Sequence, residues 1–215
     1  MLKQLFETVG AHLFDEPSTD DLFNPYSTRH PELDRPEAVD IRRDNFRRYV
    51  TERSRNPEVL LLAEAPGPWG CRFSGVPITS EAQLLDPDFP ISGRQSSTAG
   101  EPHTEYSAGI YWRILLPWHD RIFTWNTVPF HPHSNGVDLD IRTPRVSEIR
   151  RFLPVTRAVV DGLEPRAVLA VGRKAERALG ELGVDCTYVR HPSQGGAAKF
   201  ERGVRDCLHN LGIEA

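Results

Sequence analysis

Cysteine is scarce in this chain, and its three cysteines lie far apart, at Cys71, Cys186 and Cys207. An odd, scattered set argues against a disulfide framework, and the spacing does not suit a zinc or iron–sulfur site. The segment Gly172-Arg173-Lys174 lacks the upstream glycine of a phosphate-binding P-loop. We therefore expect no metal and no other cofactor. We also expect a reducing compartment: the cytoplasm, with nucleoid association if the protein is bacterial.

Long apolar runs are missing as well. No stretch approaches the roughly 20 apolar residues of a membrane helix, and the first residues lack an apolar segment followed by a small-residue cleavage site. We expect no signal peptide and no membrane partner. Positive charge is not in excess either, because 26 Lys and Arg against 30 Asp and Glu give a net charge of −4. DNA remains open as a partner, since phosphate contacts need only a local basic surface.

What the chain does contain is the pattern of one α/β domain. Its 215 residues, 39% of them hydrophobic, are enough for one sizeable core. The predicted strands are 59–63, 122–126, 167–171 and 186–190, and the predicted helices are 106–116, 145–163, 174–182 and 197–211. This alternation predicts a three-layer α/β/α sandwich with a central, mainly parallel four-stranded sheet. We predict one domain over 1–215, in which a helical and loop wrap (1–54) precedes a catalytic core (55–215).

Polar side chains follow each predicted strand. The four strand ends carry Glu64-Ala65-Pro66-Gly67, Asn126-Thr127-Val128-Pro129, Gly172-Arg173-Lys174 and His191-Pro192-Ser193. Ligands of open parallel sheets bind beyond the carboxyl ends of the strands. We therefore expect a carboxylate, a carboxamide, cations and an imidazole to meet in one crevice.

Four segments at these ends carry a family resemblance. The segments AEAPGPWGCRFSGVPITSE, WNTVPFHP, AVGRKA and VRHPSQGG occur in the order seen in the uracil-DNA glycosylase superfamily. Ala63 to Gly67 resembles the GEAPG-type first motif, and His191-Pro192-Ser193 resembles the HPS-type last motif. The resemblance implies an enzyme that flips uracil out of DNA and hydrolyses its N-glycosidic bond. The branch with an iron–sulfur cluster carries four cysteines, which the three here cannot supply.

The resemblance assigns two recognition groups. Asn126 matches the pocket asparagine, whose carboxamide accepts from uracil N3–H and donates to O4. Taken alone, an asparagine here is more often a residue that closes a turn. His191 matches the histidine that donates to uracil O2 as negative charge develops in the transition state. Its alternative is a loop histidine whose ring is bonded to the backbone.

Glu64 is our candidate for the catalytic acid. The resemblance associates an acid at this position with polarising water or stabilising an oxocarbenium-like sugar. Ala65 stands where another branch has its water-activating aspartate. Glu81 and His131 are reserves for the same role. The alternative for Glu64 is a helix-capping carboxylate at a strand end.

The stacking partner of the base departs from the family pattern. Relatives have phenylalanine near the position of Ile78, so Phe73 is our nearest aromatic substitute, with Trp69 and Trp125 as further candidates that are equally suited to the core. Ala65, Pro66 and Gly67 would line the base pocket through their backbone. The expected DNA contacts are Arg173, Lys174, Arg190, Ser193, Gln194, Gly195 and Lys199, each cation having a solvated surface charge as its alternative.

These residues predict a monofunctional glycosylase that acts on uracil in DNA as a monomer, with other deaminated bases as additional substrates. Two alternatives remain open. One is a glycosylase that acts mainly on hypoxanthine or xanthine. The other is a low-turnover protein of the same fold that binds uracil or abasic sites, which the alanine at position 65 would permit.

Overall fold

The computed structural model describes residues 1–214, and its centre is a sheet of four parallel strands. These are β2 (Val59–Ala63), β3 (Ile122–Asn126), β5 (Ala167–Val171) and β6 (Thr187–Val189), in the order β3-β2-β5-β6. Every residue of β2 and β3 is buried, as their continuous apolar runs predict. The predicted parallel sheet is confirmed. Ala63 pairs in register with Asn126, so the polar segments that follow both strands begin at the same level.

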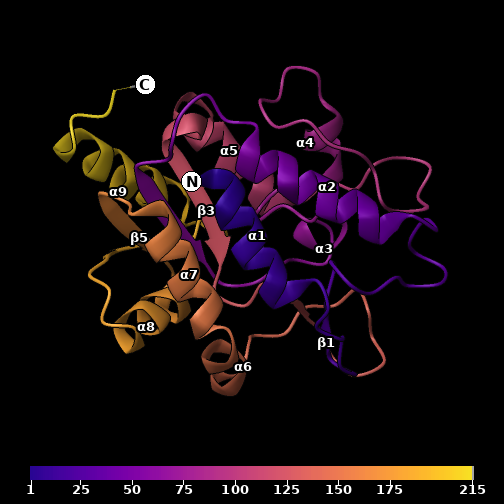
Figure 1. Ribbon diagram of the computed structural model, residues 1–215. Helices are drawn as coiled ribbons and strands as arrows, with labels where there is room; N and C mark the ends of the chain where they lie inside the picture. The colour runs from indigo at the N-terminus through magenta and orange to yellow at the C-terminus, as the bar shows by residue number, and fades with distance from the viewer. Residues whose placement is uncertain (215) are drawn as a thin grey trace.

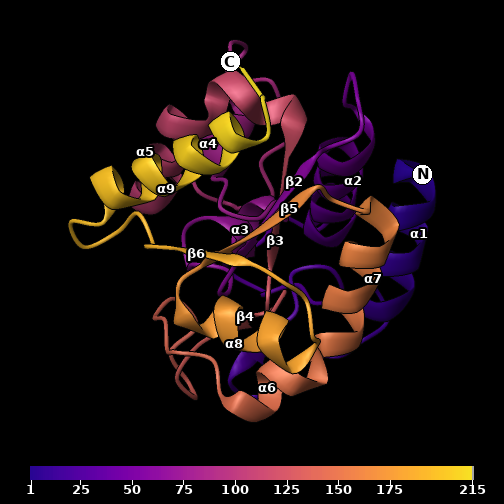
Figure 2. The ribbon, with the colours of Figure 1, turned by 90° about the vertical axis from the view of Figure 1, so that its left-hand side faces the viewer.

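Helices cover both faces of this sheet. Helices α5 (Tyr106–Leu115) and α9 (Ala197–Asn210) lie on one side, and α1 (Leu2–Leu13) and α7 (Leu153–Leu163) lie on the other (Figure 2). Helix α8 (Arg173–Glu181) connects β5 to β6 and packs against both strands. The three-layer α/β/α architecture is therefore confirmed. The N-terminal helix α1 packs beside α7, although the two helices are far apart in sequence (Figure 1).

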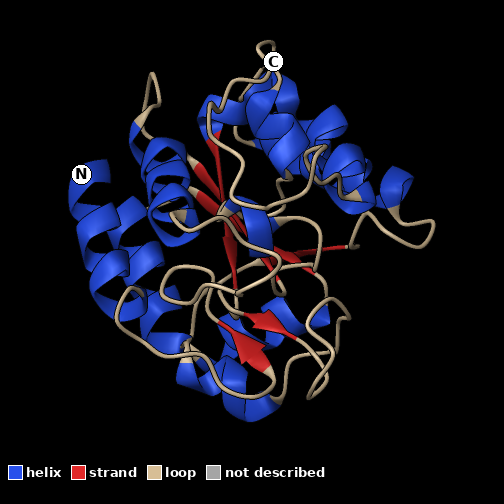
Figure 3. Ribbon diagram, turned by 90° about the vertical axis from the view of Figure 1, so that its right-hand side faces the viewer, coloured by secondary structure: helices blue, strands red, loops and turns tan. Residues whose placement is uncertain are grey.

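Shorter elements fill the connections. They are β1 (Leu22–Phe23), α3 (Cys71–Ser74), α4 (Glu81–Leu85), the 3₁₀ helix η1 (Leu116–Arg121), β4 (His131–Pro132) and α6 (Val146–Arg151). Strands β1 and β4 pair antiparallel in a second, small sheet (Figure 3). Through this pair, the predicted N-terminal wrap reaches the segment that follows β3. No helix within residues 1–214 combines the length and apolar character needed to cross a bilayer.

Two predicted elements differ from the structure. The helix expected over 145–163 is divided at Phe152 into α6 and α7, because Pro154 occupies the first turn of α7. Proline suits the start of a helix but cannot donate in its interior, so the single long helix was wrong. The last strand is also shorter than 186–190, covering only three residues at the edge of the sheet.

Helix α2 (Ala38–Thr51) closes the open edge of the sheet at β3. The Tyr49 hydroxyl donates to the carbonyl oxygen of Thr124 at 3.0 Å and accepts from the Thr124 N–H at 2.6 Å. One phenol therefore takes both backbone bonds that a further strand would make at this point. An unpaired, buried backbone group is costly, which is why the edge needs this cover.

Replacing Tyr49 with phenylalanine tests this edge closure. Y49F leaves the buried N–H and carbonyl of Thr124 without partners, so we expect it to lower the free energy of unfolding by about 1–3 kcal/mol. Y106F is the matched control, because Tyr106 is 81% exposed. It should change stability by less than about 0.5 kcal/mol in the same urea titration. Equal stability of the two variants would contradict the edge role.

Candidate active site

A cavity of about 470 Å³ lies beyond the carboxyl ends of the strands. Four segments line it, and two of them follow β2 and β6; the segments that follow β3 and β5 are not among the lining residues. The lining residues are Glu64, Ala65, Gly67, Pro68, Glu105, Ser107, Ile141, Arg142, Thr143, Pro144, Arg190, His191, Ser193 and Gln194. Two other hollows, of 310 and 520 Å³, lie around α7 and contain no histidine and no comparable set of polar groups. Seven residues expected at the site from the sequence thus share one cavity.

His191 is held in one tautomer by the turn that follows it. The Ser193 N–H donates to His191 Nδ1 at 3.2 Å, and Ser193 Oγ lies 2.8 Å from the same nitrogen. Because Nδ1 accepts, the proton of the neutral ring is on Nε2. Burial lowers the pKa of His191, and the positive charge of Arg190 lowers it further. The ring is therefore a neutral donor through Nε2, which is the form needed to stabilise a developing oxyanion.

Glu64 follows β2 and lines the same cavity. Burial raises the pKa of its carboxyl group, and the charge of Lys174 partly offsets that rise. Lys174 Nζ lies 3.4 Å from the carbonyl oxygen of Pro144, another lining residue, so the ammonium sits beside the cavity. This carboxylate is less well solvated than a surface glutamate, which makes it a stronger base.

Asn126 is only 2% exposed and lies behind the loop that follows β2. Its Nδ2 donates to Cys71 Sγ at 3.8 Å, whereas its Oδ1 has no hydrogen-bond partner. A buried amide oxygen without a partner is destabilising, so such atoms are common where a ligand supplies the missing donor. Asn126 pairs with Ala63, whose neighbour Glu64 lines the cavity, but Asn126 itself is not among the lining residues.

The expected stacking residues are not on the cavity surface either. Phe73 is fully buried, with the Arg72 guanidinium 4.1 Å from its ring centre and the His103 ring 4.3 Å away. Ile78 is 8% exposed, and Trp112 donates to its carbonyl oxygen. The φ of Ile78 is 45°, a strained value for a β-branched residue.

The tryptophans also leave the cavity without an aromatic floor. Trp125 is buried against Phe46, and Trp69, although 40% exposed, leans on Phe73 and His103. No phenylalanine, tyrosine or tryptophan is among the residues that line the cavity in the described structure. A base in this site would therefore be held chiefly by polar contacts and by the backbone of the loop that follows β2.

The two reserve residues differ in availability. Glu81 is fully buried, and its carboxylate accepts from the N–H groups of Ser96, Ser97 and His103. These bonds hold loop backbone in place and leave Glu81 unavailable for catalysis. His131 donates from Nδ1 to the Pro66 carbonyl oxygen at 2.8 Å, which leaves Nε2 as a buried acceptor without a partner. Burial lowers the pKa of His131 to about 4, so its ring is neutral.

The expected DNA contacts divide into two groups. Arg190, Ser193 and Gln194 line the cavity, and Gln194 and Gly195 have positive φ values of 52° and 74°. The other group points elsewhere: Arg173 stacks on Tyr188 at 4.0 Å and pairs with Glu176, and Lys199 is exposed on α9. Neither lines the cavity.

Sequence reasoning missed one whole wall. Glu105, Ser107 and the segment 141–144 line the cavity without following a predicted strand. The side chain of Arg142 is engaged elsewhere, in bonds to the Glu148 carboxylate. Glu105 directly precedes a helix, a position where an acid usually has only a capping role, so the sequence contained no signal that it faces this site.

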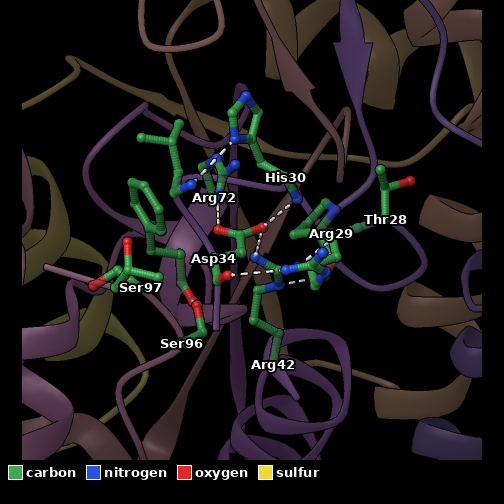
Figure 4. Close-up of polar contacts among 12 residues, drawn as sticks. Thr28, Arg29, His30, Asp34, Arg42, Arg72, Ser96 and Ser97 are labelled. Carbon is green, nitrogen blue, oxygen red and sulfur yellow. Dashed lines mark hydrogen bonds and ion pairs between the residues drawn. The ribbon is translucent and has the colours of Figure 1, made fainter. Parts of the chain in front are cut away.

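A buried network of two ion pairs anchors the end of the loop that follows β2. Asp34, from the N-terminal wrap, lies between the guanidinium groups of Arg42 and Arg72 (Figure 4). Both pairs are fully buried. Burial opposes ionisation of Asp34, but the two guanidinium groups outweigh it and hold its pKa below the ordinary range. Arg72 belongs to α3, so the network fixes the end of the loop that carries Glu64 and Gly67.

Comparisons with known proteins agree with this architecture. A sequence model described as the Uracil DNA glycosylase superfamily matches residues 51–209. Among 33 matching solved chains, SMUG2 from Pedobacter heparinus superposes with a TM-score of 0.67. The superposition includes 98% of this chain and 99% of the SMUG2 chain, and the two sequences are 13% identical. No curated protein matches in sequence.

The effect of the Lys174 charge on the carboxyl group of Glu64 predicts a pH effect. The ammonium lowers the pKa of Glu64, so K174M should raise it. If the ionised carboxylate is the active form, the single-turnover rate of base release falls as the pH is lowered through the pKa of Glu64. In K174M this fall should begin at a higher pH. E64Q should lower the rate about a hundredfold and abolish that fall.

K3M, on a lysine at the exposed start of α1, is the control and should reproduce the wild-type profile. Rates are measured at saturating enzyme, so that weaker DNA binding does not enter. A fall that stays at the same pH in K174M, or that survives in E64Q, would exclude Glu64 as the titrating group.

Proposed function

The chain belongs to the uracil DNA glycosylase superfamily, and we propose that it is a monofunctional glycosylase that hydrolyses the N-glycosidic bond of uracil flipped out of DNA. Its products would be free uracil and an abasic site. The observation that carries the proposal is the meeting of His191 and Glu64 in one cavity. The unpartnered amide oxygen belongs to Asn126, which pairs with Ala63, the residue directly before Glu64. The bond is out of reach inside a duplex, which is why the base must leave the stack.

Each group has a defined task in this proposal. Asn126 Oδ1 accepts from uracil N3–H, a donor that cytosine lacks, and so reads the base. His191 donates from Nε2 to uracil O2 as the bond breaks and charge accumulates on the departing ring. A preorganised donor of this kind contributes on the order of 3 kcal/mol. Glu64 orients the attacking water or stabilises the positively charged sugar.

The nucleophile in this proposal is water. The residues that line the cavity in the described structure include no lysine. Lys174 lies beside the cavity, and we assign its ammonium to lowering the pKa of Glu64, not to forming a Schiff base with the sugar. Strand cleavage by the protein itself is therefore not expected. Arg190, Ser193 and Gln194, which line the cavity, are suited to hold the phosphates that flank the flipped nucleotide.

A gel assay tests the function. Oligonucleotides that contain uracil, hypoxanthine or xanthine are incubated with excess enzyme, and alkali then cuts any abasic site. Wild-type protein should release uracil, and N126A and H191A should each be slower by about a hundredfold or more. H209A and N210A, both exposed at the far end of α9, are matched controls and should behave as wild type.

The assay also separates the alternatives. A protein that binds uracil-containing DNA tightly but releases no base would contradict the glycosylase proposal and favour a lesion-binding role. Release that N126A and H191A leave unchanged would place the reaction in another site. Strand breaks before alkali would contradict water as the nucleophile.

A further inference from the structure

The side-chain amide of Asn126 has two ends of nearly the same shape and opposite chemistry. Its Oδ1 only accepts hydrogen bonds, and its Nδ2 only donates them. Oδ1 turned toward the base accepts from uracil N3–H, whereas Nδ2 in the same place would donate to N3 of cytosine, which carries no hydrogen. The orientation of this one amide therefore decides between uracil and cytosine, and the surrounding fold must fix it.

A chain of hydrogen bonds leads from this amide into the core. Asn126 Nδ2 donates to Cys71 Sγ at 3.8 Å, and the Cys71 thiol is hydrogen-bonded to the Tyr26 hydroxyl. The Tyr26 hydroxyl donates in turn to the Gly75 carbonyl oxygen at 2.8 Å. Asn126, Cys71 and Tyr26 are each at most 2% exposed, so bulk water does not reach these bonds. We call this chain, from Asn126 through Cys71 and Tyr26 to Gly75, the amide relay.

The Gly75 carbonyl sets the direction of every bond in the amide relay. A carbonyl oxygen only accepts, so the single hydroxyl proton of Tyr26 is committed to it. The Tyr26 oxygen is then an acceptor toward Cys71, whose thiol proton points to it. The sulfur presents its lone pairs to Asn126, which must offer Nδ2. Burial raises the pKa of both Tyr26 and Cys71, so both keep the protons on which this order depends.

The other end of the amide relay is an acceptor that has no partner. With Nδ2 bonded to Cys71, the Oδ1 atom of Asn126 is buried without a hydrogen bond. Such an atom is destabilising until a donor arrives, and uracil N3–H would supply that donor. Nδ2 carries a second hydrogen, which is left for uracil O4.

We propose that Cys71 and Tyr26 are positioning residues that hold Oδ1 of Asn126 toward the base, so that the site takes uracil and rejects cytosine. The inference rests on the proposed function, in which Asn126 contacts the flipped base. Tyr26 belongs to the N-terminal wrap and lies outside residues 51–209, which match the family model. The wrap thus takes part in reading the base.

Binding to uncleavable DNA tests the amide relay. The duplexes carry 2′-fluoro-2′-deoxyuridine or 2′-fluoro-2′-deoxycytidine opposite thymine, with which neither base forms a Watson–Crick pair. C71A removes the acceptor for Nδ2 and lets the amide rotate, so the ratio of uracil to cytosine affinity should fall about tenfold or more. Y26F frees the thiol proton to point at Asn126 and should lower the ratio as well.

Two further variants serve as rescue and control. C71S keeps both an acceptor and a donor at this position and should retain the wild-type ratio. C207A makes the same change as C71A on α9, away from the amide relay, and should also leave the ratio unchanged. Urea titrations show which variants are folded, and Y26F alone decides if C71A is not.

The outcomes separate a positioning role from a packing role. Lost packing would weaken binding to both duplexes equally, so an unchanged ratio in either folded variant would overturn the inference. A wild-type ratio near one, or a C71S ratio as low as that of C71A, would overturn it too. Uracil release from cleavable DNA is measured in parallel. Its absence in wild type would overturn the glycosylase proposal, while the binding ratios still decide the amide relay.

Discussion

One buried carboxylate holds together the parts of the chain that build the site. Asp34 comes from the N-terminal wrap, and it pairs with Arg42 on α2 and Arg72 on α3. Removing one partner of such a buried network typically costs about 3–5 kcal/mol, because charges are then left unpaired in a poorly solvated interior. Without Asp34, neither guanidinium would have a counter-ion and α3 would lose its anchor. The N-terminal wrap thus helps to position the loop that follows β2.

The cavity follows from that anchor and from the parallel sheet. Strands that run in one direction end at one edge, so segments far apart in sequence deliver Glu64 and His191 to the same space. The backbone then sets their chemistry. The Ser193 N–H fixes the tautomer of His191, and burial beside the cavity makes Glu64 more basic than a surface glutamate. Function is therefore encoded in the surroundings of these side chains as much as in their identity.

The sequence predicted the parts that depend on periodicity and on strand ends. The four-stranded parallel sheet and its helical layers are confirmed, and Glu64, His191 and Ser193 share a cavity as the strand-end rule predicts. It failed where position depends on packing between distant segments. Phe73 was expected on the base and is in the core, between Arg72 and His103, because its contact with His103, from a later loop, is made only in the folded chain. Glu105 was missed for the same reason, since only the fold brings it against Gly67 and Gly70.

The most direct test of the account is a crystal structure of the protein bound to a duplex that contains uncleavable 2′-fluoro-2′-deoxyuridine. The account predicts a uracil flipped into the cavity, with N3 within hydrogen-bond distance of Asn126 Oδ1 and O2 within that distance of His191 Nε2. A uracil that stays stacked in the duplex, or that binds outside the cavity lined by Glu64 and His191, would contradict it.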